Sequence, residues 1–197
     1  MLACDDLLRP QRLWSRAEVL ARPSPVPKAP GVYAWYFRNL DSLVPSLDCL
    51  AVGESRLLYI GISPSAPPTN GKLPSKQLLH DRVRYHMQGN AEGSTLRLSP
   101  GASWRGRLGI QLCRVGSGKR LTFATGEQWL SEWLEENARV AWLPCEAPWT
   151  VEAHLIATVN LPLNLEQNSR CSFHWALTQL RRDAKSRARE LPILGRE

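Results

Sequence analysis

Two apolar stretches in the first third of the chain have the composition of β-strands. Residues 31–38 read GVYAWYFR and residues 57–62 read LLYIGI, and both are rich in the aromatic and β-branched side chains that favour strands. The connection between them, residues 39–56, is more polar. This order predicts an antiparallel pair of strands.

The rest of the chain alternates between helical and strand-like spacing. Apolar positions three to four residues apart predict helices over 75–88, 126–137, 148–160 and 173–190. Residues 94–101 favour a short helix or a turn. Further strands are predicted over 108–115, 121–125 and 139–144.

The two ends of the chain differ from its middle. Residues 6–21 show weak helical periodicity that Pro10 interrupts, and residues 22–30 contain four prolines, which predicts an extended linker. We expect an α/β fold, with a small, mainly antiparallel central sheet flanked by helices. The expected division is an N-terminal arm with a Pro-rich linker (1–30), a central domain (31–168) and a basic C-terminal helix packed on it (169–197).

The composition fits one domain with a terminal extension. The chain has 197 residues and is 43% hydrophobic, which is sufficient for a core. No apolar run approaches the ~18 residues of a membrane-spanning helix, and the N-terminal stretch MLACDDLLRPQRLW lacks the pattern of a signal peptide. The five cysteines are scattered without a CxxC pair, which argues against a zinc knuckle. Reduced cysteines and a cytoplasmic location are therefore expected.

The chain is basic, with 25 Lys and Arg against 18 Asp and Glu, a formal net charge of +7 and a pI of about 9.5. Such a balance favours a polyanionic partner, above all nucleic acid. Basic residues are frequent near the C-terminus, where residues 180–190 read LRRDAKSRARE. These cations either bind nucleic acid or lie on a solvated helix end, where they suit the helix dipole.

One carboxylate stands on an otherwise apolar helix face. In the helix expected over 148–160, Glu152 shares its face with Leu155, Ile156 and Val159. A glutamate is rarely buried unless it is paired or binds a metal. Glu152 is therefore a metal ligand or an acid–base group, or else a side chain that reaches solvent at the edge of the face.

A basic pair follows helical spacing in the helix expected over 75–88. Arg82 and His86 are four residues apart and share a face. A guanidinium binds phosphate oxygens in a fork, and an imidazole transfers protons near neutral pH. The alternative is a solvated basic face. Arg84 lies on another face and competes with Arg82 for the phosphate role.

Each expected strand of the first pair also carries a tyrosine close to a glycine, Tyr33 and Tyr59. Considered singly, each is most simply a packed core residue, because tyrosine is common in strands.

Taken together, the ordered residues resemble the GIY-YIG nuclease family over about residues 31–168. The resemblance rests on GVY at 31–33, YIG at 59–61, Arg82 with His86, Glu152, and Asn164 in LPLN. The long separation of GVY from YIG, the Arg-x-x-x-His spacing and the twelve-residue step from Glu152 to Asn164 are similar to the restriction-endonuclease branch.

The resemblance implies an active site on the central sheet. The two motif strands would be adjacent, and the hydroxyls of Tyr33 and Tyr59 would converge on the scissile phosphate. Glu152 would hold one divalent ion, Mg²⁺ or Mn²⁺, because such ions prefer oxygen ligands.

The resemblance also implies individual roles. Tyr33 would be the general base, with its pKa lowered from the usual value of about 10 by nearby positive charge. Arg82 would balance charge in the transition state. His86 would relay the proton away from Tyr33. Asn164 would orient phosphate or water through its amide.

Two features depart from the family pattern. Valine replaces isoleucine in GVY, and Ile62 and Ser63 follow YIG where several relatives place a lysine. Lys72 and Lys76 are the candidates to take the place of that lysine. The residues expected to contact nucleic acid are Arg84, Lys72, Lys76, Arg182, Lys185 and Arg189, with a path near Arg97, Arg105 and Arg107 as the alternative.

The resulting hypothesis is a metal-dependent DNA endonuclease, with double-strand cleavage of the restriction type favoured. Two alternatives stay open: a structure-specific or single-strand nuclease of repair or mobile-element biology, and a DNA-binding module that has lost catalysis. A double-strand cutter with one small active site usually acts as a dimer, so a homodimer is part of the hypothesis. No membrane association is expected.

Overall fold

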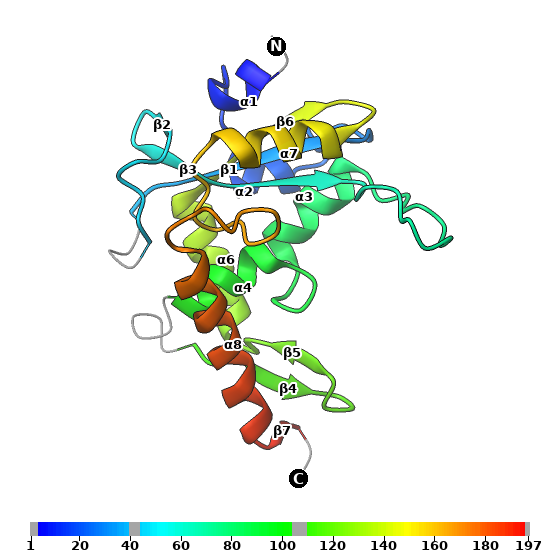
Figure 1. Cartoon of the computed structure of the whole chain (residues 1–197). Helices are drawn as coiled ribbons and strands as arrows, with labels where there is room; N and C mark the ends of the chain where they lie inside the picture. Colours follow the sequence, from blue (N-terminus) through cyan, green and yellow to red (C-terminus); the bar gives the residue numbers. More distant parts are fainter. Residues whose placement is uncertain (1–3, 40–43, 104–109, 196–197) are drawn as a thin grey trace.

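The computed structural model of the chain describes residues 4–39, 44–103 and 110–195. At its centre, four antiparallel strands form one sheet in the order β2-β3-β1-β6 (Figure 1). The strands are β1 (Gly31–Phe37), β2 (Ala51–Val52), β3 (Ser55–Ser63) and β6 (Ala138–Pro144). The pairing of β1 with β3 confirms the antiparallel pair predicted from the two apolar stretches.

Strand β1 is an inner strand of the sheet, and all seven of its residues are buried. Tyr33, Trp35 and Phe37 belong to one hydrophobic core, and the alternate residues of the strand belong to a second. A strand that is covered on both faces reads as a continuous apolar run rather than as an alternation. The GVYAWYF run therefore has a direct structural explanation.

Helices cover both faces of the central sheet. Val83 of α3 and Leu130 of α6 pack in the core that contains Tyr33, together with Val19 of α2. Leu155 of α7 and Leu7 of α1 pack on the opposite face. The helices are α1 (Asp5–Leu8), α2 (Arg16–Leu20), α3 (Leu79–Gln88), α6 (Gly126–Asn137) and α7 (Pro148–Thr158).

The C-terminal helix lies beside a second, smaller sheet in the lower half of Figure 1. Leu177 and Ala188 are buried in the main core, so one side of this helix packs on the domain. The sheet pairs β4 antiparallel with β5 and parallel with β7. These elements are α4 (Thr95–Ser103), β4 (Cys113–Val115), β5 (Arg120–Thr122), α8 (His174–Glu190) and β7 (Ile193–Leu194).

The observed helices differ from the predicted ones mainly at their ends, and the helix expected over 148–160 ends at Thr158. The helix expected from residue 75 begins at Leu79, because Leu78 is still extended, with φ of −110° and ψ of 165°. The weak helix expected over 6–21 consists of two short helices that end and begin on either side of Pro10. No helix in the described part of the chain is long and apolar enough to cross a membrane.

The predicted strands after α4 are shorter than expected. Of the described residues in 108–115, only Cys113–Val115 form a strand. The strand expected over 121–125 ends at Thr122, because Ala124 has a φ of 50°, which is incompatible with a continuing strand. The two-residue strands β2 and β7 were not expected, since two residues carry no periodicity.

Candidate active site

The register of the central sheet brings the two motif tyrosines together on one face. Tyr33 of β1 lies opposite Gly61 of β3, and Tyr59 lies opposite Trp35. A Cβ atom on Gly61 would come within 2.5 Å of Tyr33 Oη, so a larger residue would displace the tyrosine ring. The ring centroids of Tyr33 and Tyr59 are 6.4 Å apart. The glycine of YIG thus leaves the space that the tyrosine of GVY fills.

Arg82 and His86 both reach the hydroxyl of Tyr33 from α3. Nε of Arg82 donates to Tyr33 Oη at 3.4 Å, and His86 Nε2 lies 2.9 Å from the same oxygen. Arg82 also donates from Nη1 to the carbonyl of Gly93 at 2.9 Å, which fixes the guanidinium. The helix therefore brings the predicted pair to one atom, the phenol oxygen.

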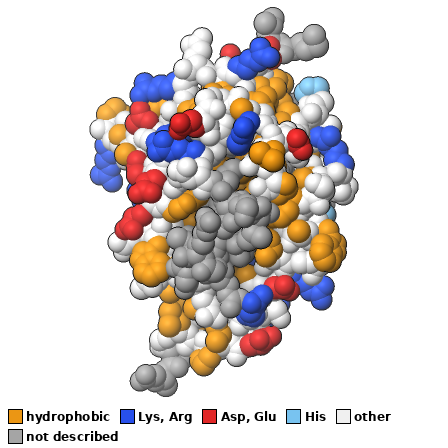
Figure 2. All heavy atoms as spheres, turned by 90° about the vertical axis from the view of Figure 1, so that its left-hand side faces the viewer, with side chains coloured by type: hydrophobic (Ala, Val, Ile, Leu, Met, Phe, Trp, Pro, Cys, Tyr) orange, Lys and Arg blue, Asp and Glu red, His pale blue; other side chains and the backbone are white. Residues whose placement is uncertain are grey.

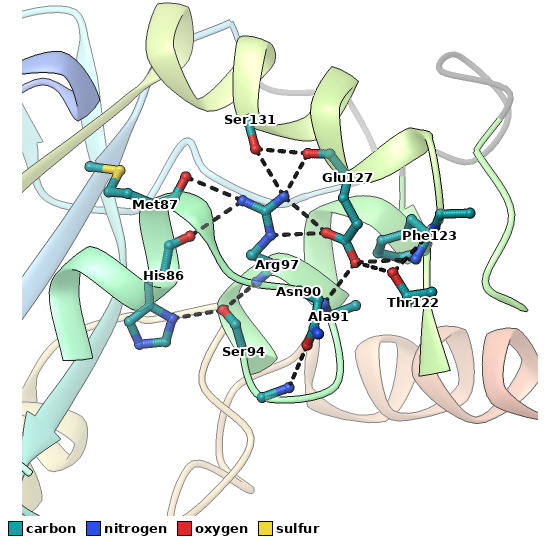
Figure 3. A network of polar contacts seen from close by, with 12 residues as sticks. His86, Met87, Asn90, Ala91, Ser94, Arg97, Thr122, Phe123, Glu127 and Ser131 are labelled. Atoms are coloured by element: carbon teal, nitrogen blue, oxygen red, sulfur yellow. Dashed lines mark hydrogen bonds and ion pairs between the residues drawn. The ribbon is translucent and has the colours of Figure 1, made fainter. Parts of the chain in front are cut away.

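His86 is completely buried and forms a second hydrogen bond (Figure 3). Its Nδ1 lies 2.7 Å from Ser94 Oγ. Burial lowers the pKa of His86 well below its ordinary value of 6.5, and the nearby charges of Arg82 and Arg97 lower it further. The imidazole is therefore neutral at physiological pH.

Arg97 supports this corner of the site from within the protein. It is completely buried, and its guanidinium donates to Glu127 Oε2 from Nε at 3.0 Å and from Nη2 at 2.9 Å. The alternative path for nucleic acid near Arg97 is therefore wrong for this residue, because its donors face the interior. Arg105 and Arg107, the other residues of that path, lie outside the described residues.

Glu152 lies on the side of α7 that continues into the buried residues Leu155 and Ile156. Burial raises the pKa of the Glu152 carboxyl from about 4.5 to about 7, and the negative charge of Glu166 adds to this effect. Leu155 and Ile156 lie on this face as expected, whereas Val159, expected on the same face, is extended and follows the end of the helix at Thr158.

Glu152 opens onto two adjacent cavities. The main cavity has a volume of about 420 Å³, and its lining includes Tyr33, Tyr59, Arg82, Glu152 and Glu166. The side cavity has a volume of about 180 Å³ and shares Tyr59 and both glutamates with the main cavity. The predicted tyrosines, arginine and glutamate therefore face a common space.

Asn164 has a different contact from the expected one. Its Oδ1 accepts from the backbone N–H of Ile60 at 2.9 Å, and its Nδ2 donates to the carbonyl of Ile60 at 2.8 Å. The side chain is buried, at 5% exposure. This backbone pair joins the loop after α7 to β3, next to Tyr59, and Asn164 also lines the side cavity, so its expected contact to phosphate or water stays a prediction.

Arg181 of α8 reaches the side cavity. Its Nε donates to Ser99 Oγ at 3.0 Å, and its Nη2 donates to the same oxygen and to the carbonyl of Leu163, the latter at 3.2 Å. The side cavity therefore includes a residue of the helix whose later cations are expected to contact nucleic acid. Helical spacing places Arg181 on the same face as Leu177 and Ala188, the buried residues of the helix, and this spacing was the signal that Arg181 faces the domain.

The other predicted nucleic-acid contacts lie outside the two cavities. Lys72 and Lys76 are exposed on the loop after β3, whereas Ser65 and Ala66 are the residues of that loop that line the main cavity. Arg84 donates to the carbonyl of Val19 at 2.7 Å, so Arg82 and not Arg84 serves the tyrosine site. The exposed cations of α8 include Arg182, Lys185 and Arg189.

The main cavity fits a single hard cation. In the described part of the chain, no three or more His, Cys, Asp and Glu side chains are placed to bind one metal together. Glu152 and Glu166 do face the same cavity, and a cation between them would offset the burial and repulsion that raise the pKa of Glu152. Mg²⁺ typically binds through one or two carboxylates, water and substrate phosphate.

Two supporting residues, Ser94 and Glu166, were not identified from the sequence. Glu166 lies two residues after Asn164 on the same loop, so closeness to a motif residue was the available signal. Ser94 precedes the first residue of α4, where a serine suggests only a helix cap. Its contact with His86 depends on how α4 packs against α3.

Comparison with known proteins identifies the family. No curated protein and no solved structure matches the chain. The family model of the GIY-YIG catalytic domain matches residues 31–183, a range that contains every residue lining the main cavity. Because this match covers more than half of the chain, the protein belongs to the GIY-YIG family and is a DNA endonuclease, an enzyme that hydrolyses phosphodiester bonds.

Proposed function

We propose that the protein cleaves both strands of duplex DNA in a reaction that requires Mg²⁺ or Mn²⁺, as a restriction-type endonuclease does. The observation that carries the proposal is the convergence of Tyr33, Arg82 and Glu152 on one cavity of about 420 Å³. Hydrolysis of a phosphodiester needs a proton acceptor, a cation near the phosphate and support for the leaving oxygen. Tyr33 is the proposed proton acceptor, and Arg82 is the cation near the phosphate. A divalent ion held by Glu152 would support the leaving oxygen.

Tyr33 is the group proposed to accept the proton of the attacking water. Burial raises the pKa of its hydroxyl above the ordinary value of 10, and Tyr59 adds to this effect, whereas Arg82 opposes it. The phenol is therefore protonated in the free protein. It becomes a base only when positive charge arrives with the substrate.

Glu152 is the proposed ligand of that ion, with Glu166 beside it. When bound there, the divalent ion would neutralise phosphate charge and stabilise the leaving oxygen. Arg82 uses two N–H donors in the hydrogen bonds to Tyr33 and Gly93, and a guanidinium has five. Arg82 therefore retains donors for a phosphate oxygen.

The DNA backbone is proposed to follow exposed cations beyond the cavities. Figure 2 shows one face of the molecule, on which Lys and Arg side chains are interspersed with Asp and Glu. The described residues of that face therefore offer no continuous positive surface to DNA. The exposed cations of α8, with Lys72, Lys76 and Arg84, stay the predicted contacts.

Cleavage of defined DNA substrates tests the proposal. The purified protein is incubated with supercoiled plasmid, single-stranded circles and branched duplexes, with Mg²⁺, Mn²⁺ or EDTA. Linear plasmid that forms without a long-lived nicked intermediate supports double-strand cleavage. Cleavage confined to branched or single-stranded DNA favours the repair or mobile-element alternative, and binding without cleavage favours an inactive module.

Two further expectations accompany the proposal. Double-strand cleavage with a single active site per chain implies a homodimer at the time of cleavage, which sedimentation of the protein–DNA complex tests. The cytoplasmic location stays a prediction from cysteine usage.

A further inference from the structure

The two ring nitrogens of His86 have different partners, and these partners determine which nitrogen carries the hydrogen. A neutral imidazole has one N–H donor and one acceptor nitrogen. Nδ1 lies 2.7 Å from Ser94 Oγ, and Nε2 lies 2.9 Å from Tyr33 Oη. Either the serine donates to the ring and the ring donates to the tyrosine, or both hydrogen bonds run in the opposite direction.

The surroundings of Ser94 distinguish these two cases (Figure 3). Ser94 is completely buried, and its Oγ accepts the backbone N–H of Arg97 at 3.1 Å. Among the described residues, this N–H and the His86 ring are the two partners of that oxygen. If Nδ1 carried the hydrogen, the serine hydrogen would be buried without an acceptor, which is unfavourable. If Ser94 donates to Nδ1, the buried serine hydrogen is paired, and the one hydrogen left without a protein acceptor is that of Tyr33, which lines the main cavity.

We propose that Ser94 is a positioning residue that holds His86 in the Nε2–H tautomer, so that the ring donates to Tyr33. The tyrosine oxygen then accepts two N–H groups, from His86 and from Arg82 at 3.4 Å. Its own hydrogen is left to point toward the main cavity, which Tyr33 lines. Hydrogen bonds donated to a phenol oxygen favour the phenolate.

This inference rests on the proposed function and replaces the proton relay that the family resemblance implies for His86. His86 supports Tyr33 as a hydrogen-bond donor and does not receive the proton of the phenol. That proton leaves through the main cavity instead. Ser94 therefore determines the direction in which Tyr33 loses its proton.

The residue that bonds to Ser94 is itself held firmly. Arg97 donates from Nη1 to the carbonyls of His86 at 3.5 Å and Met87 at 3.4 Å, in addition to its pair with Glu127. The start of α4 is thereby joined to the end of α3 and to α6. The distance between Ser94 and the His86 ring is consequently fixed by buried contacts on three helices.

Nuclear magnetic resonance tests the tautomer directly. The protein is labelled with ¹⁵N in histidine, and long-range ¹H–¹⁵N spectra are recorded at about pH 8 without DNA or metal. His86→Gln identifies the His86 signals among those of the four histidines. We expect the chemical shift of an unprotonated nitrogen for Nδ1 and of a protonated nitrogen for Nε2. The reverse pattern in the wild-type protein overturns the proposal.

Variants separate positioning from simple structural support. Ser94→Ala should change the tautomer pattern of His86 and reduce cleavage by roughly tenfold or more, since a misoriented imidazole tautomer impairs catalysis. Ser94→Thr should restore both. Ser131→Ala is the matched control, because Ser131 contacts Arg97 but has no bond to His86. A wild-type spectrum and cleavage rate for Ser94→Ala would contradict the proposal.

Tyr33→Phe provides a second test that does not depend on the folding of a Ser94 variant. The ring should remain the Nε2–H tautomer, because Ser94 and not Tyr33 sets it. A switch to Nδ1–H in this variant would contradict the proposal. The spectra require no cleavage, so a wrong tautomer is distinguished from a protein that lacks nuclease activity.

Discussion

Replacing Glu152 by glutamine should have opposite effects on stability and on catalysis. Burial and the charge of Glu166 raise the pKa of this carboxyl from about 4.5 to about 7. Below about pH 4.5 the carboxyl is protonated in both the folded and the unfolded chain. Between pH 4.5 and 7 the folded protein binds the proton more tightly, so the free energy of unfolding falls as the pH rises, and it stays lower above pH 7.

The size of the effect follows from the pKa. At about 1.36 kcal/mol per pH unit, the rise from 4.5 to about 7 corresponds to about 3 kcal/mol. Partial contact of the side chain with solvent reduces this to about 2 kcal/mol. Glutamine has the shape of the protonated glutamate and cannot ionise. Glu152→Gln should therefore match the wild type near pH 4.5 and exceed its stability by about 2 kcal/mol at pH 8 in EDTA.

Urea unfolding monitored by tryptophan fluorescence measures this difference at several pH values between 4.5 and 8. Glu146→Gln is the control, because Glu146 is an exposed glutamate just before the same helix. Added Mg²⁺ should stabilise the wild type and leave Glu152→Gln unchanged, since a ligand stabilises only the state that binds it. Cleavage by Glu152→Gln should be lost while DNA affinity is largely retained.

Two results would refute the reasoning. An identical pH dependence of stability for Glu152→Gln and the wild type would mean that the carboxylate is well solvated. Cleavage at a near wild-type rate would mean that the carboxylate does not hold the ion.

Three further predictions concern the same site and the tail helix. Tyr33→Phe should fold and lose roughly 10²-fold or more in cleavage rate, the usual effect of losing a positioned acid–base group; an unchanged rate would return Tyr33 to a packing role. Glu166→Gln should lower the pKa of Glu152 by removing a neighbouring charge, so a stability curve whose midpoint in pH is the same as in the wild type would contradict the electrostatic effect of Glu166. A variant of α8 replaces three exposed cations by glutamine, namely Arg182, Lys185 and Arg189. If each contacts a phosphate, the slope of log K for DNA binding against log salt concentration should become less steep by roughly two to three, while cleavage at saturating DNA persists. An unaltered slope would exclude these contacts.

The sequence predicted the central sheet and most helices because their signals are local. The run GVYAWYF is apolar at every position since β1 is covered on both faces, and α6 and α7 keep their apolar spacing. The errors lie where a tertiary contact or a single backbone angle determines the end of an element, as Leu78 does for the start of α3 and Ala124 for the end of β5. The strand β7 exists because α8 brings the end of the chain to β4, which no local pattern can indicate.

The reactive groups of the site were predictable for a different reason. Glu152 contradicts its local surroundings, since a carboxylate stands on an otherwise apolar helix face, whereas Tyr33 and Arg82 were indicated by their places in the ordered motif. The supporting residues have types that are ordinary for their places in the sequence. Ser94 is an ordinary residue before a helix, and its function depends on a helix packing that sequence spacing does not determine.

The motif therefore combines residues that act in two physically different ways. Gly61 has no side chain, and its contribution is the space that the Tyr33 ring occupies against β3. The side-chain amide of Asn164 forms two hydrogen bonds with the backbone of Ile60. These bonds hold β3, which carries Tyr59, to the loop that carries Glu166. A substitution at either position would move a tyrosine without removing any reactive group. Gly61→Ala should thus reduce cleavage as Tyr33→Phe does, but it should also lower stability, because the displaced ring belongs to the core. A comparison of the two variants in one cleavage and unfolding series separates the chemistry of the motif from its packing.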